Sequence, residues 1–338
     1  MIEQYNTNTL NKALSLLNDG HVIGMPTESV YGLAADATND IAVARIYQAK
    51  GRPSFNPLII HVDSIEMARH WGVFTPLAEK LANVFWGAEP RSLTLVMKRN
   101  NEALSHLVTA GLDTVAIRMP LHPVAIELIT VFGNPLAAPS ANRSNHISPT
   151  SAEAVEGDLG DRIQLIIDGG LCTVGLESTI LDVSGDDPVL LRPGGTTVEM
   201  LENILQRPVL HYKEDNQRID KKKNQTQSHT QENEHNQSYK APGMTKRHYA
   251  PSIPLRLNID NPFPGEAYLA FGKTCVAQTN VLNLSEAGDL TEAAANLFRM
   301  MRQLDNPTHQ GIAVAPIPST GIGLAINDRL KRASYVEK

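Results

Sequence analysis

The sequence contains only two cysteines, Cys172 and Cys275, and they lie far apart. Such a pair fits neither a disulfide framework nor the short spacings of a zinc site. None of the 11 histidines forms an HExxH motif, so no metal site built by the protein alone is predicted. The chain also lacks a run of about 18 apolar residues, and its polar start does not resemble a signal peptide. These absences favour a cytoplasmic protein without a membrane span.

An excess of positive charge is missing as well. The chain has 30 Lys and Arg against 36 Asp and Glu, which gives a formal net charge of -6. Proteins whose whole surface coats nucleic acid are usually basic, so this balance argues against that role but leaves room for a local basic site. Hydrophobic residues make up 42% of the 338 residues, which is enough for sizeable cores in about two domains.

Short apolar strands alternate with amphipathic helices over the N-terminal part of the chain. The patterns predict strands at residues 21–25, 93–97, 114–118, 163–167 and 178–183. They predict helices through Leu10, Leu14 and Leu17, from a cap at Asp40 to Gly51, from Asp63, and from Thr75. Strands and helices interleaved with irregular connections indicate a mixed α/β domain.

The composition changes abruptly at residues 213–240, where Ile219 is the only aliphatic residue and Tyr239 the only aromatic. Such a segment cannot bury enough surface to offset its ordering entropy, so it is predicted to be a flexible linker. Beyond it, strand patterns at residues 267–271 and 311–315 flank a helical pattern through residues 293–304 and indicate a small βαβ-type domain. The predicted organisation is a large α/β domain at 1–207, a linker at 208–251 and a small α/β domain at 252–338.

Polar clusters at the ends of predicted elements are the candidate functional groups. Residues 26–33, PTESVYGL, follow a strand and place hydroxyl groups at its end. Lys50 and Arg52 flank Gly51 at a helix end, where a point charge and a bidentate fork can hold a polyphosphate. The alternative is structural, because cations also complement the dipole at a helix C-terminus. Arg118 ends an apolar strand and can meet either a small carboxylate or a surface ion-pair partner.

Three later clusters complete the set. The loop at residues 137–150 is rich in hydroxyl and amide groups, as nucleotide sites and solvated loops both are. Gly170 and Gly175 have the spacing of a P-loop, but Leu176 and Glu177 stand where its lysine and hydroxyl residue belong, so a P-loop is rejected. Arg192 precedes a tight turn and is well placed for a phosphate.

In this order, the clusters resemble the YrdC-like threonylcarbamoyl-AMP synthase family in its long two-domain form. The resemblance covers roughly residues 10–205 and resumes at residues 241–251, APGMTKRHYAP. It implies a large twisted mixed sheet around a concave basic cavity, with a small Rossmann-like C-terminal domain. It also implies a nucleotidyltransferase that joins L-threonine, bicarbonate and ATP, with Mg²⁺, into L-threonylcarbamoyladenylate and pyrophosphate. Downstream transferase proteins would then move the threonylcarbamoyl group to tRNA.

The resemblance assigns a role to each matching residue. Lys50 and Arg52 would be the catalytic cations on the ATP phosphates, and alanine at either position should change folding little. The ATP site would contain Thr27, Lys50, Arg52, Asn56, Thr114, Ser140, Asn142, Ser148, Arg192 and Tyr249. The threonine pocket would contain Ser29, Tyr31, His61, Arg118, Ala138 and Ser178. Independently of the resemblance, residues 241–251 are predicted to close over the cavity as a lid, because exclusion of water would protect a hydrolysable acyl adenylate.

One loop departs from the family pattern, and two other functions compete. The family's Trp-Pro-Gly-Pro-Leu-Thr turn is replaced by WGAEPRSLT at residues 86–94, which predicts a changed loop with no lost function. An RNA-binding module would use the same basic cavity, with at least weak RNA binding, although interleaved aromatics are few. An ATP-sensing regulatory protein would use it without turnover. Pyrophosphate release that requires threonine and bicarbonate separates the enzyme from both.

Overall fold

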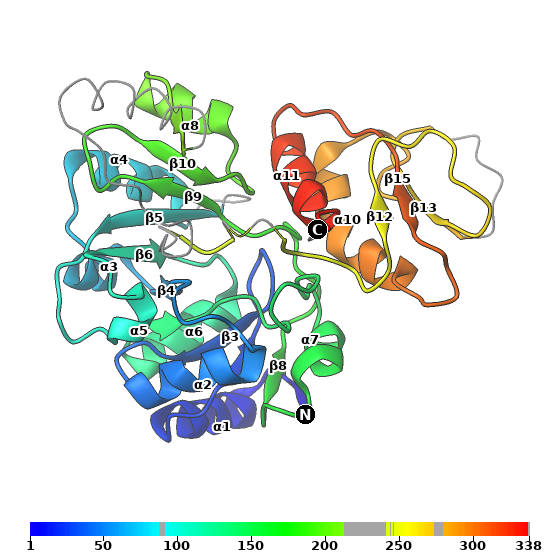
Figure 1. The fold of residues 1–338 in the computed structure, drawn as a ribbon. Helices are drawn as coiled ribbons and strands as arrows, with labels where there is room; N and C mark the ends of the chain where they lie inside the picture. The colour runs from blue at the N-terminus through cyan, green and yellow to red at the C-terminus, as the bar shows by residue number, and fades with distance from the viewer. Residues whose placement is uncertain (88–91, 213–240, 244, 246, 274–279, 337–338) are drawn as a thin grey trace, which may run out of the picture.

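The protein is represented by a computed structural model that describes residues 1–87, 92–212, 241–243, 245, 247–273 and 280–336. The predicted flexible linker at 213–240, the centre of the changed loop and Cys275 lie outside the described residues. The described chain contains one sheet of eleven strands and one of four, which Figure 1 shows in two adjacent bodies. This agrees with the predicted large mixed sheet and small second domain, whose limits stay a prediction.

The large sheet is mixed and runs in the order β1-β8-β2-β3-β7-β4-β6-β5-β9-β10-β11. Its strands are β1 Ile2–Gln4, β2 Ile23–Met25, β3 Gly32–Asp36, β4 Ile59–His61, β5 Leu93–Lys98, β6 Thr114–Arg118, β7 Leu136–Ala137, β8 Ile166–Asp168, β9 Thr179–Asp182, β10 Val189–Arg192 and β11 Leu210–His211. The predicted strands are therefore present, although β8 begins at Ile166 and not at residue 163. Strand β5 pairs with β9 and β4 with β6, so segments distant in sequence become neighbours.

Eight helices flank this sheet in the described residues. They are α1 Thr7–Asn18, α2 Asp40–Lys50, α3 Ile65–Trp71, α4 Pro76–Phe85, α5 His106–Thr109, α6 Pro123–Phe132, α7 Ala152–Leu159 and α8 Val198–Leu205. Two predicted caps are wrong by one residue: Asn39 caps α2 and Ser64 caps α3, because their extended backbones let each side chain accept hydrogen bonds from the first turn. Thr75 caps α4 as predicted, and Gly51 ends α2 with a φ of 62°.

Side chains of the central strands β4 and β6 point alternately to the two faces of the sheet, one of which holds the hydrophobic core. Ile60 of β4 and Ile117 of β6 belong to the main core, together with buried residues of α2 and α4. Their neighbours His61 and Arg118 point to the opposite face, because successive side chains of a strand alternate. That face therefore carries the polar side chains that line a cavity.

The small domain is a parallel sheet in the order β12-β15-β13-β14. Its strands are β12 Leu255–Arg256, β13 Ala267–Ala270, β14 Val281–Asn283 and β15 Ile312–Val314, and its helices are α10 Leu290–Leu304 and α11 Gly323–Ala333. The strands predicted at 267–271 and 311–315 and the helix between them are confirmed. None of the helices in the described residues combines the length and apolar character that crossing a bilayer requires.

Candidate active site

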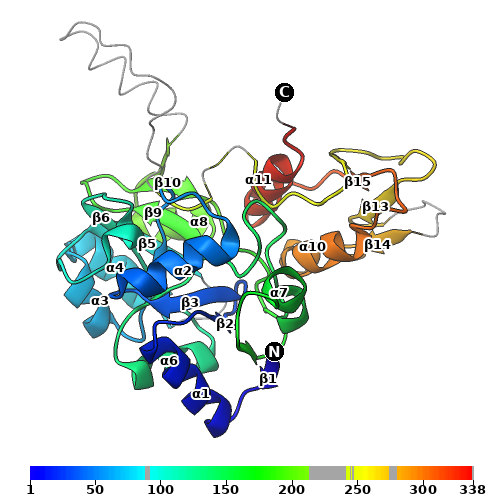
Figure 2. The same ribbon diagram turned by 60° about the horizontal axis from the view of Figure 1, so that its bottom comes forward.

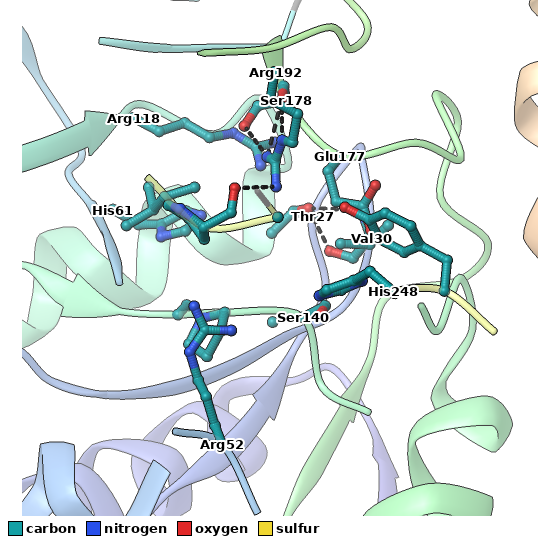
Figure 3. A pocket seen from close by; sticks show the side chains of 17 residues that line it. Thr27, Val30, Arg52, His61, Arg118, Ser140, Glu177, Ser178, Arg192 and His248 are labelled. Atoms are coloured by element: carbon teal, nitrogen blue, oxygen red, sulfur yellow. Dashed lines mark hydrogen bonds between the residues drawn. The ribbon is translucent and has the colours of Figure 1, made fainter. Parts of the chain in front are cut away.

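A basic cavity lies on the polar face of the large sheet (Figure 3). Arg52 approaches it from one side, and Arg118 and Arg192 approach from the opposite side. Its wall consists of Thr27, Val30, Gly32, Arg52, Ile59, His61, Arg118, Ala138, Pro139, Ser140, Glu177, Ser178, Arg192, Pro242, Gly243, His248 and Tyr249. The structure thus brings together nine of the predicted site residues from distant parts of the chain.

Strand register builds one side of this wall. His61 of β4 and Thr94 of β5 both stand opposite Arg118 of β6, so three polar side chains form a row across three strands. The Thr94 hydroxyl lies 2.7 Å from the hydroxyl of Ser178, which extends the row toward β9. Thr94 was not predicted as a site residue, since only the strand pairing reveals its place.

Arg118 does not form the surface ion pair that was its structural alternative. It is buried, and its guanidinium forms an ion pair with the buried carboxylate of Glu28. The second oxygen of Glu28 accepts a hydrogen bond of 3.0 Å from the Leu121 amide. The Arg118 Nε atom has no hydrogen-bond partner among the described residues, which leaves one buried donor for a ligand. Glu28 was missed because nothing in the sequence pairs residue 28 with residue 118.

Arg192 connects Ser178, which precedes strand β9, with the predicted lid segment at residues 241–251. Its Nε and Nη2 atoms donate to the Ser178 carbonyl at 3.1 and 2.9 Å, and Nη2 also lies 3.2 Å from the Ser178 hydroxyl. Its Nη1 atom contacts the carbonyl of Pro242 at 3.4 Å. The predicted lid segment therefore meets the cavity at Pro242 and Gly243, and again at His248 and Tyr249.

Arg52, which was predicted to bind the ATP phosphates, lines the cavity. Its Nε and Nη2 atoms donate to the carbonyls of Asn56 and Pro57 at 3.2 and 2.9 Å, which fixes the guanidinium at the cavity wall. Burial lowers the pKa of Arg52 to about 10, so it remains a cation at neutral pH. Asn56 supports Arg52 through its carbonyl and is absent from the cavity wall.

Lys50 differs from Arg52, although the two were predicted to act together. Its ammonium group donates to the carbonyls of Ser140 and Asn142 and lies 3.3 Å from the Asn142 side-chain oxygen. Burial, with Arg52 nearby, lowers the pKa of Lys50 well below its ordinary value. Lys50 is absent from the cavity wall, so in this structure it anchors the loop that presents Ser140.

We therefore expect the Lys50→Met substitution to lower the free energy of unfolding by about 1–3 kcal/mol, because buried carbonyls of Ser140 and Asn142 would lose their donor. Methionine keeps most of the apolar stem in place. Urea unfolding followed by circular dichroism measures the change. An unchanged midpoint would contradict the anchoring role and return Lys50 to the purely catalytic role predicted from the sequence.

Thr27 lines the cavity wall, whereas Ser29 and Tyr31 do not. The Thr27 hydroxyl donates to the Val30 carbonyl at 2.6 Å and lies 3.0 Å from the hydroxyl of Ser29, which is fully buried. Tyr31 donates to the Gly170 carbonyl at 2.8 Å, and burial raises its pKa well above the ordinary value. Ser29 and Tyr31 are thus outside the wall of this cavity and shape the turn beneath it.

Two further predicted residues stand apart from the cavity. Asn142 uses its amide nitrogen to donate to the carbonyls of Arg143 and His146 at 2.9 and 2.7 Å, so it holds its own loop. Thr114 begins β6, whereas Arg118 ends it, and the rise of a strand separates them by roughly 13 Å. Thr114 is therefore absent from the cavity wall, and its contact with ATP stays a prediction.

Two acidic side chains reach the site, and both have basic partners. Glu177 accepts a hydrogen bond from the Ser148 hydroxyl and forms an ion pair with Arg329 at 2.8 Å. Glu28 pairs with Arg118. Within the described residues, no group of three or more His, Cys, Asp or Glu side chains is placed to hold a metal ion.

His61 is neutral at physiological pH. Burial, and then the nearby charge of Arg118, lowers its pKa to about 3 from an ordinary value near 6.5. Below pH 6.5 the unfolded state consequently binds one more proton than the folded state, so stability decreases as the pH falls toward 3. A neutral imidazole can accompany an anionic ligand without adding a second buried charge beside Arg118.

We expect the His61→Gln substitution to reduce the pH dependence of stability. Between pH 6 and 5 the slope of the unfolding free energy should decrease by about 1 kcal/mol per pH unit, because the proton uptake on unfolding is removed. Urea unfolding at pH 7, 6 and 5 gives this slope for both proteins. Parallel curves would show that His61 is not held neutral by the fold.

Two family models match consecutive parts of the chain. Residues 15–194 match the Sua5/YciO/YrdC model, described as "Telomere recombination". Residues 196–334 match the model described as "Threonylcarbamoyl-AMP synthase, C-terminal domain".

Relatives of known name cover nearly the whole chain. Threonylcarbamoyl-AMP synthase of Bacillus subtilis is 39% identical over 96% of this chain and 92% of the relative. The Pyrococcus abyssi protein of the same name is 37% identical over 95% of this chain and 93% of the relative. A crystal structure of P. abyssi Sua5 complexed with L-threonine superposes with a TM-score of 0.83 at 35% identity and covers 99% of this chain and 96% of that chain. This protein therefore belongs to the Sua5/YciO/YrdC family, in the form that carries the threonylcarbamoyl-AMP synthase C-terminal domain.

Proposed function

We propose that this protein is a threonylcarbamoyl-AMP synthase that acts as a nucleotidyltransferase. It would join L-threonine, bicarbonate and ATP into L-threonylcarbamoyladenylate and release pyrophosphate. The observation that carries this proposal is the convergence of Arg52, Arg118 and Arg192 on one cavity in a chain whose full-length relatives bear that name.

The chemistry suits these side chains. Threonine and bicarbonate lose water to give a carbamate, whose oxygen attacks the α-phosphorus of ATP while the bond to pyrophosphate breaks. Two anions must approach each other, and charge accumulates on the leaving group, so fixed cations lower the barrier by electrostatic stabilisation. Arg52 and Arg192 would bind the phosphates, and Arg118 would orient the threonine carboxylate. Mg²⁺, bound by the phosphates of ATP, would neutralise part of their charge when it is present.

Residues 241–251, which follow the predicted flexible stretch at 213–240, are proposed to act as a lid. Pro242, Gly243, His248 and Tyr249 line the cavity, and the Tyr249 backbone has a φ of 63°, a conformation that non-glycine residues seldom adopt. Closing this segment over the site would exclude water and protect an acyl adenylate from hydrolysis. Downstream transferases would then use the product for tRNA modification, with weak RNA binding as a further expectation.

Pyrophosphate release tests the proposal. It should require ATP, threonine and bicarbonate together, and omission of either threonine or bicarbonate should remove it. Release that depends on ATP alone would contradict the synthase. Binding of ATP without turnover would favour a sensor, and tight RNA binding without turnover would favour an RNA-binding module.

A further inference from the structure

An arginine of the small domain reaches the wall of the cavity. Arg329 lies on α11, and its side chain is fully buried. Its Nε atom donates to the Glu177 carboxylate at 2.8 Å, while the Ser148 hydroxyl donates to the other oxygen of this carboxylate. Glu177 lines the cavity, so the two domains each hold one oxygen of the same group.

The same guanidinium also contacts the segment that closes the cavity. It lies 5.1 Å from the ring centroid of Tyr249, which stacks on Phe298 of α10 with centroids 5.5 Å apart. Asp328 accepts a hydrogen bond of 2.8 Å from Arg329 Nη1 and thereby fixes the orientation of the guanidinium. The small domain thus holds both Glu177 and Tyr249 in place.

This contact belongs to a close-packed interface. Val30, Ile147 and Leu176 of the large domain belong to the same apolar cluster as the core of the small domain. Gly175 has a φ of 71°, and a Cβ at this position would lie 2.5 Å from the Cα of Ala295 in α10, so only glycine fits here. Such a close backbone contact fixes the position of the small domain and therefore the position of Arg329 relative to Glu177.

A second ion pair joins the domains beside the first. Arg302 of α10 pairs with Asp158 of α7 at 2.7 Å and also donates to the Ile147 carbonyl. Figure 2 shows α10 next to α7. Two ion pairs, Arg329–Glu177 and Arg302–Asp158, therefore join the domains.

Glu177 would be unfavourable beside a polyphosphate if it were alone. Burial raises the pKa of its carboxyl, but the charges of Arg329 and Arg192 outweigh burial and leave the pKa below the ordinary value. The group is consequently an anion at neutral pH. Like charges a few ångströms apart repel strongly in a site that excludes water. A buried counter-ion removes this repulsion without filling the space that the nucleotide needs.

We infer that Arg329 is a positioning residue of the synthase site, supplied by the small domain, which neutralises Glu177 and thereby permits ATP to bind beside it. The inference rests on the proposed function. It gives the small domain a task in the reaction: to complete the wall of the nucleotide site.

A double-mutant cycle on residues 329 and 177 tests this inference. The KM values for ATP and for threonine are measured for Arg329→Met in the Glu177 background and in the Glu177→Gln background. With Glu177 present, Arg329→Met should raise the ATP KM about tenfold or more and the threonine KM less than about threefold, because one buried charge is left uncompensated. In the Glu177→Gln background the same change should raise the ATP KM less than about twofold. Arg256→Met is the matched control, since Arg256 pairs with Glu266 within the small domain and lines no part of the cavity.

Equal effects in the two backgrounds, or equal rises in both KM values, would overturn the inference and leave Arg329 a structural residue. Arg329→Gln covers the case in which the methionine variant does not fold, because glutamine keeps a donor but not the charge. It should also raise the ATP KM about tenfold, and a near-native value would show that the hydrogen bond alone suffices. Calorimetric ATP binding repeats the cycle without turnover. Wild-type protein that binds ATP but releases no pyrophosphate would then refute the proposed function, while the cycle on ATP affinity still decides the role of Arg329.

Discussion

The Arg52→Ala substitution is expected to lower pyrophosphate release by about 10²-fold or more at saturating threonine and bicarbonate. Removal of a fixed electrostatic stabiliser has effects of this size, since the cation acts mainly on charge that develops in the transition state. Arg52 is the residue of the predicted catalytic pair whose guanidinium lines the cavity. The assay is the initial rate of pyrophosphate release at several ATP concentrations.

Stability must be measured beside activity for this variant. Arg52 donates to the carbonyls of Asn56 and Pro57, so its loss should lower the free energy of unfolding by about 1–3 kcal/mol, more than the sequence interpretation anticipated. The assay temperature should lie well below the unfolding midpoint. Arg69→Ala is the control, because Arg69 is an exposed arginine that pairs with Glu79 outside the cavity. Near-native activity of the folded Arg52 variant would move the phosphate site elsewhere.

The Arg118→Ala substitution should destabilise the protein by about 3–5 kcal/mol and weaken threonine binding. The stability loss follows from burial, because Glu28 would remain as a buried carboxylate without its cationic partner. The binding loss follows from the missing charge-assisted hydrogen bonds to the amino-acid carboxylate. ATP affinity should change much less. Urea unfolding and calorimetric titration with each ligand give the three quantities.

Combining Arg118→Ala with Glu28→Gln separates the two roles of Arg118. The double variant should recover much of the lost stability, because no uncompensated charge remains in the interior. Threonine affinity should stay low, since the cation is still absent. If the double variant bound threonine as well as the wild type does, Arg118 would be only the partner of Glu28. If both ligands weakened equally, Arg118 would not be selective for the threonine side.

The amino-acid sequence determined the local structure and the identity of the motifs. Strands such as β6 at Thr114–Arg118 and the Thr75 cap of α4 were predicted correctly, because hydrophobic period and capping chemistry are encoded within a few residues. Where the sequence interpretation failed locally, as at Asn39 and Ser64, two adjacent residues could both cap, and the backbone conformation chose between them. The order of the polar clusters was enough to indicate the family.

Only the tertiary structure decided which polar side chains reach the cavity. Lys50 and Arg52 are equivalent in the sequence pattern, but the donors of Lys50 are taken by the loop of Ser140, while Arg52 lines the cavity. Arg118 and Arg329 find their partners across 90 and 152 residues of chain. Strand pairing and domain packing set such contacts, and a buried charge has to find its counter-ion wherever the fold places one. No local pattern contains that information, and for this reason the contribution of the small domain to the site could be seen only in the folded protein.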